Sequence, residues 1–253
     1  MKRRWYITAG TLTFLLAMVL LAPAASLSAW LAPKQAPATI ELFGVQGTVG
    51  SGQAAGLNIS GHPALSNLQW SLRSWRLLLG QLAFQLQSGG DTALEGRVGM
   101  SLFGTTSVDN LHSEMGIKAL LSAIGQPYLP VDGKAALDMD SVRVRKQKIK
   151  SADGKIEIHN LAWTLASEPI ELGGLTATIS TESGAVLVKI EPLPGALEIS
   201  GDAKLTVSDQ SYQAHLQLRP KPDANPLIRN LLSSAGEPDG QGWYHLRRQG
   251  ILQ

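Results

Sequence analysis

The chain has 253 residues, with 22 lysine and arginine side chains against 20 acidic ones, and a formal net charge of +2. Because it contains no cysteine, neither a disulfide framework nor a thiolate metal site can form. The near balance of charge gives no sequence-wide basic bias, so nucleic acid is not an expected partner. The length is sufficient for one ordinary domain or two small ones.

Residues 1–33 have the pattern of a membrane anchor. Lys2, Arg3 and Arg4 precede a stretch from Trp5 to Pro33 that carries no charged side chain. As a helix, residues 5–22 would be about 27 Å long, close to the hydrocarbon thickness of about 30 Å. The residues expected to face lipid, or to mark its two boundaries, are Trp5, Tyr6, Leu15, Leu16, Leu20, Leu21 and Trp30.

The charges around this segment predict its orientation. The cations lie before the apolar stretch and the first acidic residue is Glu41, so the positive-inside rule places the N-terminus in the cytoplasm and residues 34–253 outside it. A cleaved signal peptide is the alternative, since small residues follow from Ala22 to Ala29. An uncleaved anchor is favoured because the apolar stretch exceeds the usual signal-peptide core of about 7 to 15 residues.

From Thr39 onward, apolar and polar residues alternate, with glycines between the alternating segments. This period of two is typical of strands with one buried face, and the short spacers indicate antiparallel connections. The sequence therefore predicts a mainly β, antiparallel domain over residues 34–253, with a seam at 126–133 as an alternative division. The expected strands include 40–42, 68–72, 82–86, 156–158, 187–190, 205–207, 216–218 and 243–252.

Two segments after the anchor predict short amphipathic helices. The first begins with Ser113 as N-cap and runs to Ile124. The second has Asn225 as N-cap, Pro226 at its first position and Gly236 after its end. Neither has the basic polar face of a helix that lies on a membrane, so both are expected to pack on the sheet.

Motifs for chemistry are not found in the sequence. The glycines between residues 44 and 56 lack the GxGxxG and GxxxxGK[ST] spacings, and no HExxH, GxSxG or SxxK sequence occurs. Asp138 and Asp140 could place two carboxylates on one strand face, but no further acids lie near them in the sequence. We therefore expect no catalytic residue, no cofactor and no metal site, and the chain is not expected to be an enzyme.

The candidate contact site is a run of cations that we call the basic run: Arg143, Arg145, Lys146, Lys148 and Lys150. On one regular strand, 143 and 145 would lie on one face and 146, 148 and 150 on the other. A protruding edge or hairpin, whose cations prevent edge-to-edge association, is the favoured interpretation. The alternative is a contact for an acidic partner or for anionic lipid headgroups.

Three tryptophans lie in or near strand-like sequence after the anchor, at positions 70, 75 and 243. Large aromatic rings in such segments most often fill the core, so Trp70, Trp75 and Trp243 are expected to be buried. The alternative is an exposed position at an interface with another protein.

The order of several short motifs resembles the type II secretion system protein N family. An N-terminal span is followed by GTVGSG at 47–52, then by LQW at 68–70 and LGQL at 79–82, and the chain ends with GWYHL at 242–246 and GIL at 250–252. The resemblance covers nearly the whole chain. In the family a bulky aromatic commonly stands between the valine and the serine of the turn, whereas this chain has Gly50 there.

This resemblance implies a single-pass component of the bacterial inner membrane with a periplasmic C-terminal domain. Such a protein would be an accessory of the general secretion pathway, which carries folded proteins from the periplasm across the outer membrane. Its expected partners are other secretion subunits and the inner membrane, and it would have no active site.

The family is also similar to AsmA-like proteins, whose curved sheets form apolar grooves. This similarity implies an extended, curved antiparallel sheet and an alternative function, the binding or transfer of lipid in the periplasm. In that case phospholipid is a partner. An enzyme remains the third class, and it would need a polar pocket that the linear sequence does not disclose.

Overall fold

The computed structural model describes residues 11, 14, 17–25, 40–59, 62–90, 92–123, 126, 128–165, 168–233 and 236–252. Trp5, Tyr6, Leu15, Leu16 and Trp30 of the predicted anchor lie outside these residues, and the helical residues 17–21 include Leu20 and Leu21. Within the described ranges, no helix is both long enough and apolar enough to span a membrane.

The described elements follow one another as a meander, with three short helical segments between strands. Their bounds are β1 (Ile40–Phe43), β2 (Gln46–Gly47), β3 (Ser51–Ile59), β4 (His62–Leu72), the 3₁₀ helix η1 (Ser74–Leu79), β5 (Gln81–Gly89), β6 (Ala93–Ser101), β7 (Thr105–Gly116), α3 (Ile117–Ala123), β8 (Val131–Arg145), β9 (Lys148–Trp163), β10 (Ile170–Glu182), β11 (Ala185–Leu193), β12 (Leu197–Thr206), β13 (Ser211–Pro220), α4 (Pro226–Ser233) and β14 (Tyr244–Ile251). The prediction of a mainly β, antiparallel structure is confirmed.

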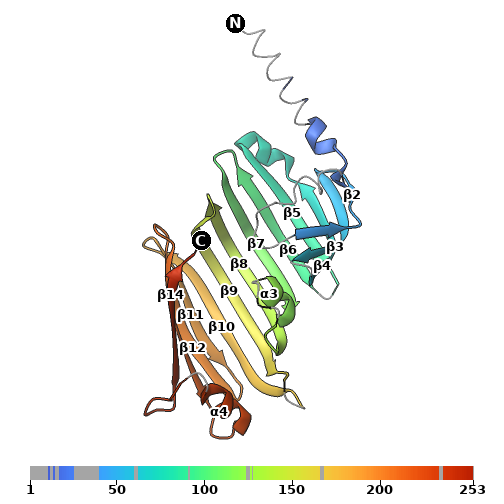
Figure 1. Cartoon of the computed structure of the whole chain (residues 1–253). Helices are drawn as coiled ribbons and strands as arrows, with labels where there is room; N and C mark the ends of the chain where they lie inside the picture. The colour runs from blue at the N-terminus through green and yellow to red at the C-terminus, as the bar shows by residue number, and fades with distance from the viewer. Residues whose placement is uncertain are drawn as a thin grey trace.

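All the strands belong to one sheet, in which β3 to β14 are neighbours in sequence order, while β1 and β2 both pair with β3 (Figure 1). Each pairing is antiparallel, as short connections require. Alternation places apolar side chains on one face, where one row of opposed residues contains Leu94, Ser113, Leu137, Ile156, Ala177, Ile190, Gly201, Leu216 and Leu246.

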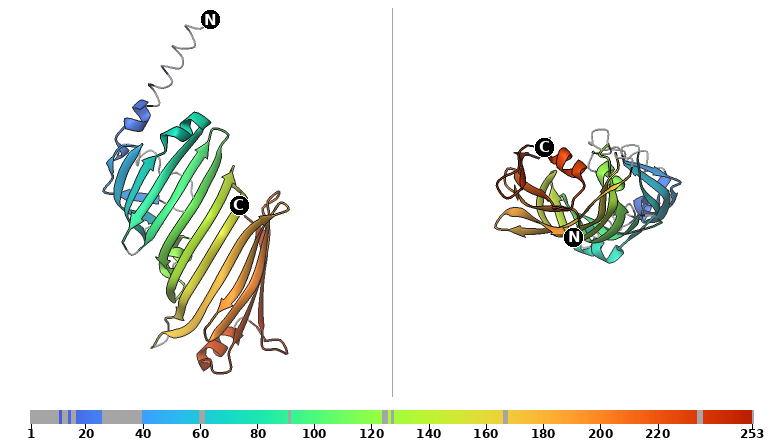
Figure 2. Two further views of the ribbon diagram at one scale, coloured as in Figure 1. Left: turned by 180° about the vertical axis from the view of Figure 1, so that it is seen from behind. Right: turned by 90° about the horizontal axis from the view of Figure 1, so that it is seen from below.

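The sheet is bent into an arc, which is visible when it is seen from below (Figure 2). Register shifts interrupt the pairing at several places, including those next to Gly133 and Gly173. Both glycines have positive φ, +148° and +114°, which L side chains rarely adopt. Such bulges add local twist and bend to an antiparallel pair, so they contribute to the curvature.

The largest fully buried side chain among the described residues, that of Ile228, lies where α4 meets the apolar face. Asn225 caps this helix, because its Oδ1 accepts a hydrogen bond of 3.0 Å from the Leu227 N–H, and Pro226 is its first residue, as predicted. Ile228 is 1% exposed and packs with Leu232 in the main core cluster. The other buried members of that cluster are Ile170, Leu172, Leu197, Ile199, Ala224 and Tyr244.

The predicted start of the first helix is wrong. Ser113 lies within β7, and its hydroxyl donates to the Ala93 carbonyl on β6 at 3.0 Å instead of capping a helix. Because β7 pairs with β6 on one side and with β8 on the other, its backbone remains extended until Gly116. The helix α3 then begins at Ile117, which is buried, and contacts β4, β7 and β8.

Candidate interaction surfaces

The face of the sheet opposite α4 is polar from one end to the other. One row of directly opposed residues runs from β2 to β14 and contains Gln46, Gln53, Gln69, Gln87, Glu95, His112, Asp138, Lys155, Thr178, Lys189, Asp202, His215 and Arg247. Acidic and basic residues lie opposite each other within it, as in the pairs Asp138–Lys155 and Lys189–Asp202, and His112 Nδ1 lies 2.8 Å from Asp138 Oδ1. This face therefore offers donors, acceptors and charges of both signs to a partner.

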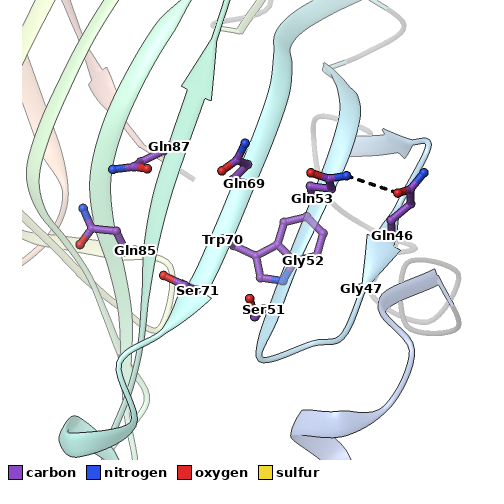
Figure 3. Close-up of a pocket in the computed structure, with 10 residues that line it drawn as sticks. All are labelled: Gln46, Gly47, Ser51, Gly52, Gln53, Gln69, Trp70, Ser71, Gln85 and Gln87. Atoms are coloured by element: carbon purple, nitrogen blue, oxygen red, sulfur yellow. Dashed lines mark hydrogen bonds between the residues drawn. The ribbon is translucent and has the colours of Figure 1, made fainter.

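Glutamines line a hollow of about 420 Å³ at the N-terminal part of this face (Figure 3). Gln53 Nε2 donates to Gln46 Oε1 at 3.3 Å, and Gln69 and Gln87 continue the row on the next two strands (Figure 3). An amide side chain both donates and accepts hydrogen bonds. The hollow is thus suited to contacts with uncharged polar groups.

The basic run forms the tip of the β8–β9 hairpin, as the favoured interpretation predicted, although both strands are interior to the sheet. The run is therefore not one regular strand, on which its cations would lie on two faces. Lys146 and Gln147 form the turn with φ of +51° and +61°, so the chain reverses and Arg145 lies opposite Lys148. Val144 and Ile149 pair on the other face.

All five cations of the basic run are exposed. Within the described part of the chain, none of them forms an ion pair shorter than 4 Å. Lys148 does act at longer range on Asp209, because its charge adds to hydrogen bonds from Ser211 that lower the pKa of that carboxyl. The basic run is therefore available for contact with anionic groups.

Gln210 binds the backbone next to the tip of this hairpin, and the sequence analysis did not identify it. Its side chain is buried, accepts from the Ile149 N–H at 2.9 Å, and donates to the carbonyls of Ile149 and Val207 at 3.1 and 2.8 Å. The amide thus replaces a strand partner for Ile149. Nothing in the local sequence indicates this contact, because 61 residues separate the two positions.

The strand β14 forms the last edge of the sheet. The Leu252 N–H donates to the Gln210 carbonyl at 3.0 Å. Because the backbone groups of successive residues in an antiparallel strand point alternately toward and away from the neighbouring strand, this bond identifies the residues of β14 that bond to β13. The residues of β14 whose backbone N–H and C=O groups point away from β13 are His245, Arg247, Gln249 and Ile251. Among the described residues no strand pairs with this side of β14.

Asp239 organises the connection that leads into this edge. Its Oδ1 accepts from the backbone N–H groups of Gln241 and Trp243, each at 2.9 Å, and its Oδ2 accepts from His245 Nε2 at 2.9 Å. These hydrogen bonds, that of His245 first, lower the pKa of Asp239 to about 2. The other nitrogen of His245 lies 3.2 Å from His215 Nε2 on β13, and the two rings are stacked.

The three tryptophans for which burial was predicted differ in their exposure. Trp70 is half-buried and donates from Nε1 to the Thr48 carbonyl at 3.2 Å, and Trp243 is half-buried beneath the Arg219 guanidinium, 4.4 Å from the ring centre. The prediction that Trp75 is buried is wrong, because its side chain is 55% exposed. The reason is local: Trp75 lies in η1, which projects beyond the strand ends.

The apolar face is the second large surface. The helices α3 and α4 both follow strands that end at the same edge of the arc, so they cover only that part of the face. Between them and the opposite strand ends, the apolar side chains are only half-buried, including Leu86, Leu94, Leu137, Ile156, Ile158, Leu175, Ile179, Ile190 and Leu216. This surface is suited to apolar ligands.

Comparisons with known proteins agree with the motifs. The family model described as "Type II secretion system (T2SS), protein N" matches residues 38–247. The chain is 29% identical to "Type II secretion system protein N" of Vibrio cholerae over 230 residues, which cover 88% of this chain and 89% of that protein. It is 26% identical to the protein of that name from Aeromonas hydrophila over 220 residues, 85% of this chain and 86% of the relative.

No solved structure matches the chain. The match to the family model nevertheless extends over most of the sheet, from β1 to β14. The resemblance that the short motifs indicated is thereby confirmed, and the chain belongs to the type II secretion system protein N family.

Proposed function

We propose that this protein is an inner-membrane accessory component of the type II secretion system. It supports the export of folded proteins from the periplasm across the outer membrane, and it acts through protein–protein contacts without catalysis. Family membership supports the assignment to the secretion system. The apolar residues 5–22 and the preceding cations support a single span with the N-terminus in the cytoplasm and the sheet in the periplasm.

The observation that carries the contact role is the free edge of β14. Half of its residues direct backbone N–H and C=O groups away from the sheet, and an extended segment of another subunit can pair with such an edge. Arg247 and Arg248 place two cations on this strand. They would disfavour pairing of two copies and favour an acidic segment.

A proline at Gln249 tests this contact. Its N–H points away from β13, so Gln249→Pro removes an outward donor but no bond of the β13–β14 ladder. We expect secretion subunits to co-purify with the wild type and with Gln249→Ala, and to be lost from Gln249→Pro. Retention of the same subunits by Gln249→Pro would exclude the edge as the contact, whereas their absence from all three samples would contradict the assembly role.

The half-buried apolar face favours a second candidate function, lipid binding in the periplasm. The two helices cover only part of this face. The part that they leave uncovered consists of half-buried leucine and isoleucine side chains from β5 to β13. Lipid extracted with the purified protein would support this function if a polar substitution at Leu137 or Ile156, in the middle of the face, reduces the amount. Equal lipid in wild type and variants would exclude it.

A further inference from the structure

The two ends of the strands differ in charge. At one end, the hairpin end, lie the turns 47–51, 72–81, 101–105, 145–148, 182–185 and 206–211, which carry five cations and two acids. At the other end, the helix end, the connections 89–93, 116–131, 163–170, 193–197 and 220–244 carry three cations and five acids. An anionic surface would therefore attract the hairpin end and repel the helix end.

Large apolar side chains are also exposed at the hairpin end, on two neighbouring turns. In η1, Trp75 is 55% and Leu79 65% exposed, and in the β6–β7 turn Leu102 is 85% and Phe103 82% exposed. The Leu102 N–H donates to the Gly80 carbonyl at 3.1 Å, so the two turns form one surface. We call these four residues the apolar turns.

The N-terminal segment joins the sheet at this same end (Figure 1). The N–H of Gly50 donates to the Leu20 carbonyl at 2.9 Å, and the N–H of Val49 donates to the Ala22 carbonyl at 3.1 Å. The Gly50 carbonyl in turn accepts from the N–H of Leu72, the last residue of β4, at 2.7 Å. The end of the apolar N-terminal stretch is thus held beside η1.

Arginines line a hollow of about 400 Å³ on the polar face behind the apolar turns. Arg76, Arg97 and Arg143 reach it from η1, β6 and β8, together with Ser101 and Thr105. Arg97 Nη2 already donates to Asn110 Oδ1 at 2.6 Å, and one carboxylate, Asp109, is also present. The planar guanidinium groups can each bind a phosphate oxygen pair.

We propose that the hairpin end rests on the anionic phospholipid surface of the membrane that the N-terminal segment enters. The apolar turns lie at the level of the headgroups and upper acyl chains, where tryptophan, phenylalanine and leucine are stable. The basic run and the arginine-lined hollow contact headgroup phosphates. This inference rests on the inner-membrane location given in the proposed function, and it deepens that function by fixing which end of the sheet faces the lipid.

The absence of cysteine from the sequence permits a clean test, because one introduced thiol is labelled alone. The full-length chain carrying Phe103→Cys, with the polarity-sensitive dye NBD on that thiol, is incorporated into vesicles of phosphatidylcholine and phosphatidylglycerol that contain a spin-labelled quencher lipid. Tyr128→Cys is the matched control, since this side chain is 92% exposed at the helix end. We expect quenching at 103 to exceed that at 128 several-fold.

A second variant and a second lipid composition test whether the contact requires opposite charges on the protein and the lipid. Neutralising the turn of the hairpin by Lys146→Gln, Lys148→Gln and Lys150→Gln should reduce quenching at 103, and vesicles of phosphatidylcholine alone should reduce it in the parent chain. Equal, weak quenching at 103 and 128 in a chain that floats with the vesicles would overturn the inference and leave the membrane anchor intact. A chain that does not float would contradict the proposed location, and the inference with it.

Discussion

At the residue scale, Asp239 determines how the chain enters the edge strand. Its carboxylate holds two backbone N–H groups and His245, and these contacts lower its pKa to about 2 from an ordinary value of 3.8. A lowered pKa in the folded state means that the stabilisation is present above the unfolded-state pKa and is lost as the pH falls through the folded-state value.

We therefore expect the loop before β14 to stay closed down to about pH 4 and to open as the pH falls towards about 2. The amide chemical shifts of Gln241 and Trp243, followed by NMR over this range, measure the opening. In Asp239→Asn the two shifts should show no transition there. A wild-type midpoint close to 4 would contradict the proposed hydrogen bonds.

Gln210 provides the second test at this scale. Gln210→Leu removes the partner of both the N–H and the C=O of Ile149, and unpaired buried groups of this kind cost about 1–3 kcal/mol of unfolding free energy. Hydrogen exchange of the Ile149 amide should also accelerate. Gln213→Leu, at an exposed position on β13, is the control and should change stability by less than about 0.5 kcal/mol. Equal effects of the two variants would contradict the role of Gln210.

At the scale of elements, α4 is the main source of core packing for the last strands. Ile228→Ala should lower the unfolding free energy by about 2–5 kcal/mol, because this side chain is 1% exposed among residues of β10, β12 and β14. Its neighbour Leu227 is 48% exposed, so Leu227→Ala should cost less than about 1 kcal/mol. Denaturant unfolding of the full chain in mild detergent compares the two, and equal losses would mean that α4 does not pack as described.

Local signals were sufficient to predict most elements. Strict alternation located the strands around residues 68–72, 82–86 and 216–218, and a cap, a proline and an apolar stripe located α4. The start of α3 was not predictable in this way, since strand pairing on both sides of β7 overrides the helical pattern that begins at Ser113.

The candidate surfaces were predicted less completely than the elements. The basic run was found because its charges are consecutive, but the face of each cation depends on the conformation of Lys146 and Gln147. The contact between Gln210 and Ile149 depends on the curvature of the whole sheet. The exposure of Trp75 follows from a helical turn that its apolar neighbours do not distinguish from a strand.

At the scale of the whole molecule, one continuous sheet presents two unlike faces and two unlike ends. The polar face and the free edge of β14 suit contacts with other subunits, while the apolar face would suit lipid. In the arrangement that we propose, the charge difference between the hairpin end and the helix end would orient the molecule relative to an anionic membrane. The β14 edge would then stay accessible to other subunits beside the membrane.

Cross-linking and co-purification of the full-length protein from its own membranes, with lipids identified by mass spectrometry in the same sample, distinguishes contact with other subunits from lipid binding. We expect secretion subunits to be cross-linked to residues 34–253, with β14 among the linked positions. Recovery of stoichiometric phospholipid without those subunits would contradict this expectation, and the apolar face would then be the functional surface.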